Sequence, residues 1–182
     1  MKSLLVWFLL SIQTVALATS PPVVPLPAST QVRSGADTEL PERLVVSVPD
    51  EWTSHVEFLS ETVQALTLGK HRIAIDDQRA PTLLIKKVDQ LENRAYTLDV
   101  SPEQIRLNAS SLKGLAHGTA TLVQLIGSAE DGRLPSLQIE DAPGTPYRNF
   151  MIDMGRNPHS IELLKETIDL LWYYKVYSVQ MH

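Results

Sequence analysis

The alternation of apolar and polar residues in the first two thirds of the chain predicts strands interleaved with two helices. Arg43 to Val48 is a β-branched run between two prolines, which is typical of a strand. After Asp50, apolar positions recur at intervals of three and four, which predicts an amphipathic helix ending near Gly69; these positions are Val56, Leu59, Val63 and Leu66. Thr82 to Val88 predicts a second strand.

A hairpin and a second helix are predicted next. Arg94 to Val100 and Gln104 to Asn108 are expected to pair as its strands, because polar and apolar side chains alternate along the first. A helix follows from about Ser111 to Ile126, ending at Gly127, with these side chains buried: Leu115, Ala116, Thr119, Leu122, Val123 and Ile126. Leu137 to Ile139 predicts a short strand. Strands around two helices indicate an α+β domain, a sheet with two helices.

After Pro146 the pattern changes to strand, helix and strand. Tyr147 to Met154 and Val176 to His182 are strand-like, and Asn157-Pro158 is expected to begin the helix between them, whose stripe is Ile161, Leu164, Ile168 and Leu171. Such a βαβ unit has parallel strands, which are buried on both faces in a complete sheet. One unit cannot bury its apolar surfaces alone, and a barrel of such units needs about 250 residues. Residues 146–182 are therefore predicted to open a larger domain.

The first residues have the features of a secretory signal peptide. Lys2 supplies a positive charge, Leu4 to Leu10 form an apolar stretch, and Ala16-Leu17-Ala18 is a cleavage site of the small-x-small type. The stretch is shorter than the ~20 residues that cross a bilayer, although an uncleaved anchor is the alternative. We predict cleavage after about Ala18, a secreted or periplasmic location, and no membrane span in the mature chain.

Composition narrows the classes of partner. The chain is 43% hydrophobic and 20% charged, which is typical of a folded globular protein. Its net charge of −5 and its lack of Lys or Arg runs argue against nucleic acid, whose binders show a basic surface. Because the sequence has no cysteine, disulfides and thiolate metal sites are excluded.

Sequence signatures of metal and nucleotide chemistry are absent. There is no His-Glu-x-x-His motif, phosphate-binding glycine loop or dinucleotide fingerprint. The histidines are scattered, and His55, His71 and His117 are predicted to be structural or on the surface, since a metal site needs several convergent ligands. We predict neither a metal site nor a cofactor.

Short motifs follow one another along the chain in an order that is informative as a set. The first group is Val24-Pro25-Leu26-Pro27, Arg94 to Leu98 and Gly114 to Leu125; the second is Asp141-Ala142-Pro143, Tyr147 to Asn157, Ile168 to Lys175 and Gln180-Met181-His182. Their order and spacing resemble glycoside hydrolase family 20, the β-N-acetylhexosaminidases. In that family the first group belongs to an N-terminal domain and the second leads into the catalytic barrel.

The resemblance implies a domain plan and a site. Residues 1–18 would be the signal peptide, 19–145 the N-terminal α+β domain, and 146–182 the opening βαβ of a truncated TIM (β/α)8 barrel. Arg156 matches an arginine that holds hydroxyls of the terminal sugar, and a guanidinium fork suits paired oxygens. Asp153 and His182 are further candidates for substrate binding.

The reaction implied by the resemblance is retaining hydrolysis of terminal β-linked N-acetylglucosamine or N-acetylgalactosamine from glycans. In this scheme the substrate's own acetamide attacks the anomeric carbon, an aspartate orients it, and a glutamate is the general acid. The family's catalytic Asp-Glu pair would lie far downstream of these motifs and is missing here, so we predict no catalytic residue in this chain and no activity of the chain alone. Gly155, Asn157 and Gln180 depart from the family pattern, which leaves substrate preference open.

Two alternative functions remain. The chain could belong to another glycosidase with a similar N-terminal domain, such as an α-glucuronidase or an O-GlcNAc hydrolase. It could also be a non-catalytic sugar-binding or scaffold module. The residues themselves do not exclude the module, because the chemistry would lie beyond His182.

Overall fold

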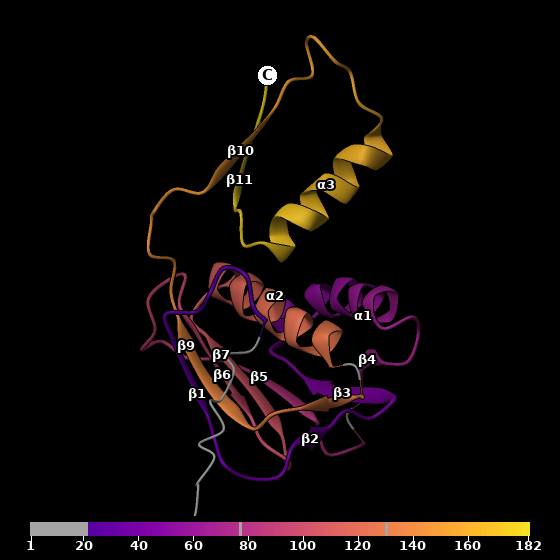
Figure 1. The fold of residues 1–182 in the computed structure, drawn as a ribbon, viewed down its shortest axis with the longest axis vertical. Coiled ribbons are helices and arrows are strands. Elements are labelled where there is room, and N and C mark those ends of the chain that lie inside the picture. Colours follow the sequence, from indigo (N-terminus) through magenta and orange to yellow (C-terminus); the bar gives the residue numbers. More distant parts are fainter. Residues whose placement is uncertain (1–21, 77, 130) are drawn as a thin grey trace, which may run out of the picture.

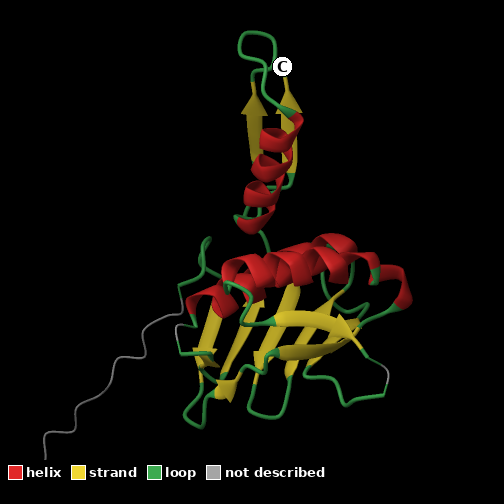
Figure 2. Cartoon of the chain, turned by 90° about the vertical axis from the view of Figure 1, so that its right-hand side faces the viewer, coloured by secondary structure: helices red, strands yellow, loops and turns green. Residues whose placement is uncertain are grey.

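The computed structural model describes residues 22–76, 78–129 and 131–182, which form two units (Figure 1). A sheet with two helices makes the larger unit, the α+β layer. A smaller βαβ unit stands on its helical side, as Figures 1 and 2 show from two directions. The predicted signal peptide, residues 1–18, lies outside the described residues.

One mixed sheet organises the α+β layer. In the described residues its seven strands run in the order β1-β9-β6-β7-β5-β3-β4. Parallel pairing joins β4, β3, β5 and β7, whereas β6, β9 and β1 pair with their neighbours in antiparallel fashion. The bounds are β1 Ser29–Val32, β3 Arg43–Ser47, β4 Arg72–Ile75, β5 Leu83–Lys87, β6 Tyr96–Val100, β7 Ile105–Ala109 and β9 Leu137–Asp141. Two short strands, β2 (Thr38–Glu39) and β8 (Arg133–Leu134), pair separately.

Two helices cover one face of this sheet (Figure 2). The first, α1 (Ser54–Leu66), follows a single 3₁₀ turn at Asp50–Trp52, so the helix begins slightly later than Asp50. The second, α2 (Leu112–Ser128), continues through Gly127 for one more residue. The α+β prediction is confirmed, and the hairpin is the antiparallel pair β6–β7.

Burial on α2 follows the predicted stripe with one exception. Leu115, Thr119 and Leu122 are fully buried, whereas Ala116 is only half-buried. On the other side of the contact, Leu98 and Leu107 of the hairpin are also fully buried. The apolar core therefore lies between the sheet and its two helices.

Two glycines let α2 approach the hairpin closely. A Cβ added at Gly114 would lie 2.4 Å from the carbonyl oxygen of Ala95, and one at Gly118 would lie 2.4 Å from Cδ1 of Leu107. Neither distance is compatible with van der Waals packing. The Gly-x-x-x-Gly spacing of this helix is thus a packing requirement of the α+β layer.

The predicted βαβ unit is confirmed. Strands β10 (Asn149–Ile152) and β11 (Ser178–Met181) are parallel and joined by α3 (Ile161–Tyr173). The predicted helix start at Asn157-Pro158 is wrong, because Ser160 is the N-cap. The Ser160 hydroxyl accepts a hydrogen bond from the Leu163 N–H at 3.2 Å, which satisfies a donor that the helix itself leaves unpaired.

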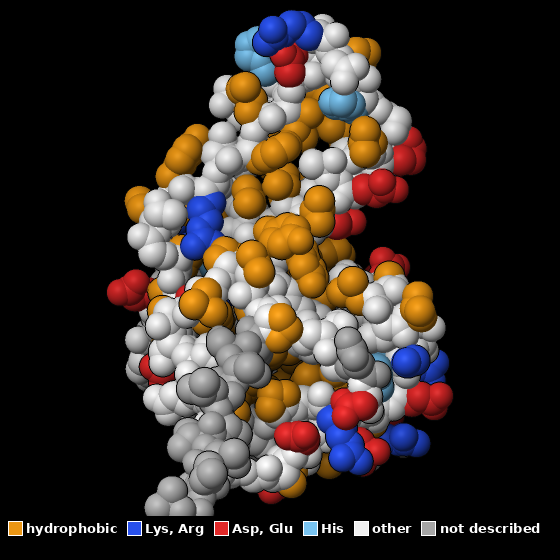
Figure 3. Space-filling model, viewed as in Figure 1, with side chains coloured by type: hydrophobic (Ala, Val, Ile, Leu, Met, Phe, Trp, Pro, Cys, Tyr) orange, Lys and Arg blue, Asp and Glu red, His pale blue; other side chains and the backbone are white. Residues whose placement is uncertain are grey.

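The apolar surface of the βαβ unit is largely exposed. Phe150 and Met151 on β10 are 46% and 57% exposed, contrary to the burial expected of such a strand. Among the described residues no third strand flanks the β10–β11 pair. Figure 3 shows hydrophobic side chains gathered over this unit and its junction with the α+β layer.

Candidate functional site

The three predicted substrate-binding residues meet at one edge of the βαβ unit. Asp153 directly follows β10, and His182 directly follows β11. Because the two strands are parallel, both residues lie at the carboxyl ends of neighbouring strands. Arg156 belongs to the turn that leaves β10, so the same edge holds all three.

Backbone hydrogen bonds close this edge. The His182 carbonyl accepts from the N–H groups of Met154 at 2.7 Å and Gly155 at 3.0 Å, while the His182 N–H donates to the Ile152 carbonyl at 2.8 Å. A Cβ at Gly155 would lie 3.7 Å from Oδ1 of Asp153, so a side chain at this position would stand directly beside the carboxylate. This link between the two strand ends was not foreseen from the sequence, because it depends on strand register.

Asp153 orients Arg156. Its Oδ2 accepts from the guanidinium Nε at 2.7 Å, and its Oδ1 accepts from the Arg156 backbone N–H at 3.0 Å. These hydrogen bonds hold the pKa of the Asp153 carboxyl below its usual value, and the bond from the Arg156 backbone has the larger effect. The Arg156 side chain is 87% exposed. Among the described residues none accepts from its terminal nitrogens, which leaves these donors available to a ligand.

The histidines flagged in the sequence have structural partners. His117 is buried in α2 with Nδ1 3.1 Å from the Arg94 carbonyl oxygen, and burial lowers its pKa. The Nε2 of His55 lies 3.0 Å from Oγ1 of Thr119, and burial lowers the pKa of this ring to about 4. His71 Nδ1 lies 2.9 Å from the Pro41 carbonyl oxygen. The prediction that these rings are structural agrees with this geometry.

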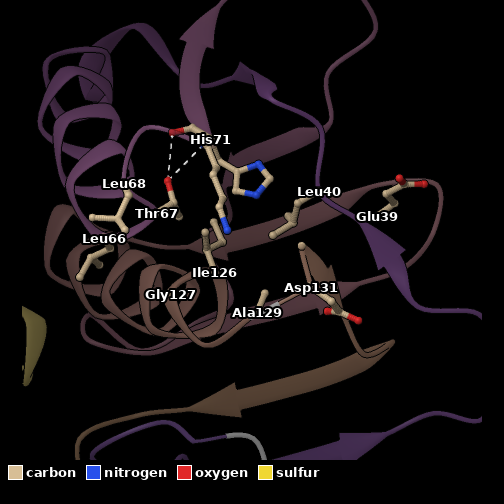
Figure 4. Close-up of a pocket in the computed structure, with 12 residues that line it drawn as sticks. Glu39, Leu40, Leu66, Thr67, Leu68, His71, Ile126, Gly127, Ala129 and Asp131 are labelled. Carbon is tan, nitrogen blue, oxygen red and sulfur yellow. Dashed lines mark hydrogen bonds between the residues drawn. The ribbon is translucent and has the colours of Figure 1, made fainter.

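A hollow of about 410 Å³ lies at the carboxyl ends of α1 and α2, away from the predicted residues (Figure 4). Thr67 Oγ1 accepts from the His71 N–H at 3.1 Å, and the same hydroxyl donates to the Val63 carbonyl at 2.7 Å. The polar side chains that line this hollow do not converge on one point (Figure 4). We therefore retain the β10–β11 edge as the candidate site. None of the helices in the described part of the chain is long and apolar enough to cross a membrane.

Comparisons with known proteins agree with this architecture. A family profile described as glycosyl hydrolase family 20, domain 2, matches residues 20–142. A β-hexosaminidase of Vibrio furnissii is 38% identical over 101 residues, 55% of this chain and 16% of that protein. One of Akkermansia muciniphila is 32% identical over 132 residues, 71% of this chain and 24% of that protein. The structure of a Vibrio harveyi exo-β-N-acetylglucosaminidase in complex with N-acetylglucosamine has a TM-score of 0.79 at 29% identity, covering 90% of this chain and 25% of that one.

These matches define the class, since the curated relatives are β-hexosaminidase-type glycosidases. The chain belongs to glycoside hydrolase family 20, as its motifs predicted. It spans 16% to 24% of the length of the two curated relatives above. Because the profile match ends at residue 142, it does not reach Asp153, Arg156 or His182, and their role stays a prediction.

Proposed function

We propose that the chain supplies the N-terminal α+β domain and the opening βαβ of a TIM barrel to a longer β-N-acetylhexosaminidase. The relatives are four to six times longer than the matched segments. The Vibrio harveyi structure matches 90% of this chain, which is more than residues 20–142 contain. The exposed apolar faces of β10 are those that the interior side chains and outer helices of a complete barrel would cover.

The observation that carries the proposed site is the meeting of Asp153, Arg156 and His182 at the carboxyl ends of β10 and β11. In TIM barrels the active site is built at this end of the strands. The planar guanidinium of Arg156 can donate two parallel hydrogen bonds, which suits neighbouring hydroxyls of a terminal sugar. Asp153 fixes the plane of that donor pair.

The substrates in this proposal are glycans that end in β-linked N-acetylglucosamine or N-acetylgalactosamine. Hydrolysis would retain the anomeric configuration, with the acetamide of the substrate as nucleophile. Residues outside this chain would supply the general acid and the aspartate that orients the acetamide. The role of this chain is to bind and orient the terminal sugar.

Export is part of the same proposal. A signal peptide cleaved after about Ala18 would deliver the enzyme to the periplasm or the medium. Mass spectrometry of the mature protein tests this, because the first residue should be Thr19. A mature protein that retains Met1 or Lys2 would contradict export by cleavage.

The activity is tested on the full enzyme encoded by the continuous reading frame. Aryl β-N-acetylglucosaminide and β-N-acetylgalactosaminide should be hydrolysed, with an aryl α-glucuronide as the matched control substrate. The 182-residue chain should hydrolyse none of them. Turnover of the glucuronide alone would favour the other glycosidase class, and no turnover of any substrate would favour the sugar-binding module.

A further inference from the structure

The βαβ unit is attached to the α+β layer by polar groups as well as by apolar packing. Phe58 of α1 and Trp172 of α3 pack edge to face with ring centroids 4.7 Å apart. Gln124 of α2 donates to the Tyr173 carbonyl at 2.7 Å. Lys175, two residues after Tyr173, extends its side chain into the α+β layer.

Lys175 has a backbone conformation that is unusual for a residue with a side chain. Its φ is +58°, in the left-handed region that glycine adopts most readily. The residue directly follows Tyr174, the C-cap of α3. Its N–H donates to the Trp172 carbonyl at 2.8 Å, and the next N–H, of Val176, donates to the Leu171 carbonyl at 2.8 Å. A glycine would serve this turn with less strain, so the backbone does not account for a lysine here.

The lysine side chain reaches a set of polar partners inside the protein. Its side chain is 3% exposed, and Nζ donates to Oδ2 of Asp141 at 3.0 Å and to the Tyr96 hydroxyl at 3.1 Å. The Tyr96 hydroxyl also lies 2.5 Å from Oγ1 of Thr121, and Asp141 Oδ1 accepts from the Ala28 N–H at 3.1 Å. Among the ion pairs of the described residues, Lys175–Asp141 is the most buried.

The partners of Lys175 all come from the α+β layer. Tyr96 begins β6 and Asp141 ends β9, and the two are direct cross-strand neighbours in the sheet. Thr121 lies on α2. The layer therefore holds a phenol and a carboxylate in place, since the Tyr96 hydroxyl donates to Asp141 Oδ2 at 3.0 Å. The βαβ unit adds Lys175, which donates to both groups.

Burial makes these groups depend on one another. It lowers the pKa of Lys175, and the charge of Asp141 acts in the opposite direction. It also raises the pKa of Tyr96, which keeps the hydroxyl protonated. A buried cation without its carboxylate is much less favourable than a buried pair, whereas replacing both partners by neutral groups can be nearly neutral.

The position of Lys175 connects this cluster to the candidate site. Strand β11 begins three residues later at Ser178 and ends one residue before His182. β10 pairs with β11 in a fixed register, with Ile152 opposite Met181. The position of Asp153, which follows Ile152, therefore depends on the position of β11. A displacement at Lys175 would move both strands and the whole edge.

We propose that Lys175 is a positioning residue, held by Asp141 and Tyr96, that fixes the βαβ unit and its sugar-binding edge on the α+β layer. The sugar-binding part of this statement rests on the proposed function. The mechanical part does not, because it concerns only the relative position of two units.

The absence of native cysteine makes this geometry measurable in the 182-residue chain. Glu57→Cys on α1 and Lys165→Cys on α3 place spin labels on exposed positions of the two units. Pulsed electron resonance then gives the distribution of distances between them in the parent, Lys175→Met, Asp141→Asn and the double variant. Arg33→Met is the matched control, since it removes an exposed pair with Asp99 inside one unit. Hydrogen exchange of the β6 and β7 amides reports whether the sheet stays folded.

We expect a narrow distribution for the parent and for Arg33→Met, and a broad or shifted one for each single variant at the junction. The double variant should disturb the distribution less than the sum of the two single changes. An unchanged distribution in Lys175→Met, or strictly additive effects, would overturn the proposal. So would loss of sheet protection in Lys175→Met, because Lys175 would then serve the core and not the junction. If Lys175 is confirmed to fix the βαβ unit on the α+β layer but the full enzyme has no hexosaminidase activity, only the proposed function is contradicted.

Discussion

At the residue scale, Arg156 carries the sharpest functional prediction. Arg156→Lys in the full enzyme should lower kcat/KM about ten- to a hundredfold, because lysine loses the fork that can serve two hydroxyls. A hydrogen bond to a charged group is worth roughly 1.5–3 kcal/mol, which corresponds to that range. The melting temperature should hardly change, since the side chain is 87% exposed. Steady-state kinetics and calorimetry measure the two effects.

Arg79→Lys is the matched control for this change. Arg79 also lies three residues after its carboxylate, with Nε 3.6 Å from Oδ2 of Asp76, but far from the β10–β11 edge in sequence and in a different unit. It should leave kcat/KM unchanged. If Arg156→Lys kept normal kinetics and melted much earlier, Arg156 would be structural.

His55 predicts how stability depends on pH. Its pKa is about 4 in the folded chain, against an ordinary value of 6.5. Between these values the unfolded chain binds a proton that the folded chain does not, so stability falls as pH drops from about 6.5 to 4. The contribution is on the order of 1–3 kcal/mol.

His55→Gln should therefore make the melting temperature less sensitive to pH in that window. Some dependence should remain, because burial also lowers the pKa of His117. His159→Gln, in the loop before α3, is the matched control. An equal pH slope in His55→Gln and the parent would contradict the lowered pKa of the His55 ring.

At the element scale, the glycines of α2 separate packing from helix propensity. Gly114→Ala places a Cβ 2.4 Å from a backbone oxygen and should cost about 1–3 kcal/mol. Gly127→Ala, in the same helix, meets nothing closer than 3.8 Å and should be neutral or stabilising by up to about 1 kcal/mol. Urea unfolding of both variants measures the difference. Equal stabilities would show that α2 can move away from the hairpin at little cost.

The elements also show where sequence patterns suffice. The two helices of the α+β layer are predicted from the helical spacing of their apolar residues, and the hairpin from the alternation of apolar and polar residues. Both patterns arise because each element buries one long face against the core. The strands at 29–32, 38–39, 72–75 and 133–134 were not predicted, since each is at most four residues long and pairs with distant segments. Such strands form because of tertiary pairing, and local pattern carries little trace of it.

Helix caps and buried charges are also hard to predict from local sequence, because they depend on tertiary contacts. Asn157-Pro158 is a good local start for a helix, yet α3 begins three residues later, where the Ser160 hydroxyl accepts from the Leu163 N–H. Lys175 ends an amphipathic stripe and resembles a solvated residue in sequence. Only the fold brings Asp141 and Tyr96 to it. The candidate site was more accessible to prediction, because parallel strands place their carboxyl ends together.

At the scale of the whole molecule, the βαβ unit presents a broad apolar surface to solvent. The exposed large side chains on it include Phe150, Met151, Ile161, Leu163, Ile168, Leu170 and Met181. Contiguous patches of this kind promote association in chains that leave them uncovered. The 182-residue chain should therefore self-associate as its concentration rises, and sedimentation velocity should detect the larger species.

A charge on this surface should suppress the association without destabilising the fold. Met151→Lys changes a side chain that is 57% exposed on β10, so the melting temperature should stay within about 2 °C of the parent. Leu68→Lys is the matched control: its side chain is 90% exposed, but it lies on the α+β layer and should leave the association unchanged. If Leu68→Lys and not Met151→Lys made the chain monomeric, the interacting surface would lie on the α+β layer. The exposed faces of β10 would then no longer support the proposal that the rest of a barrel covers them.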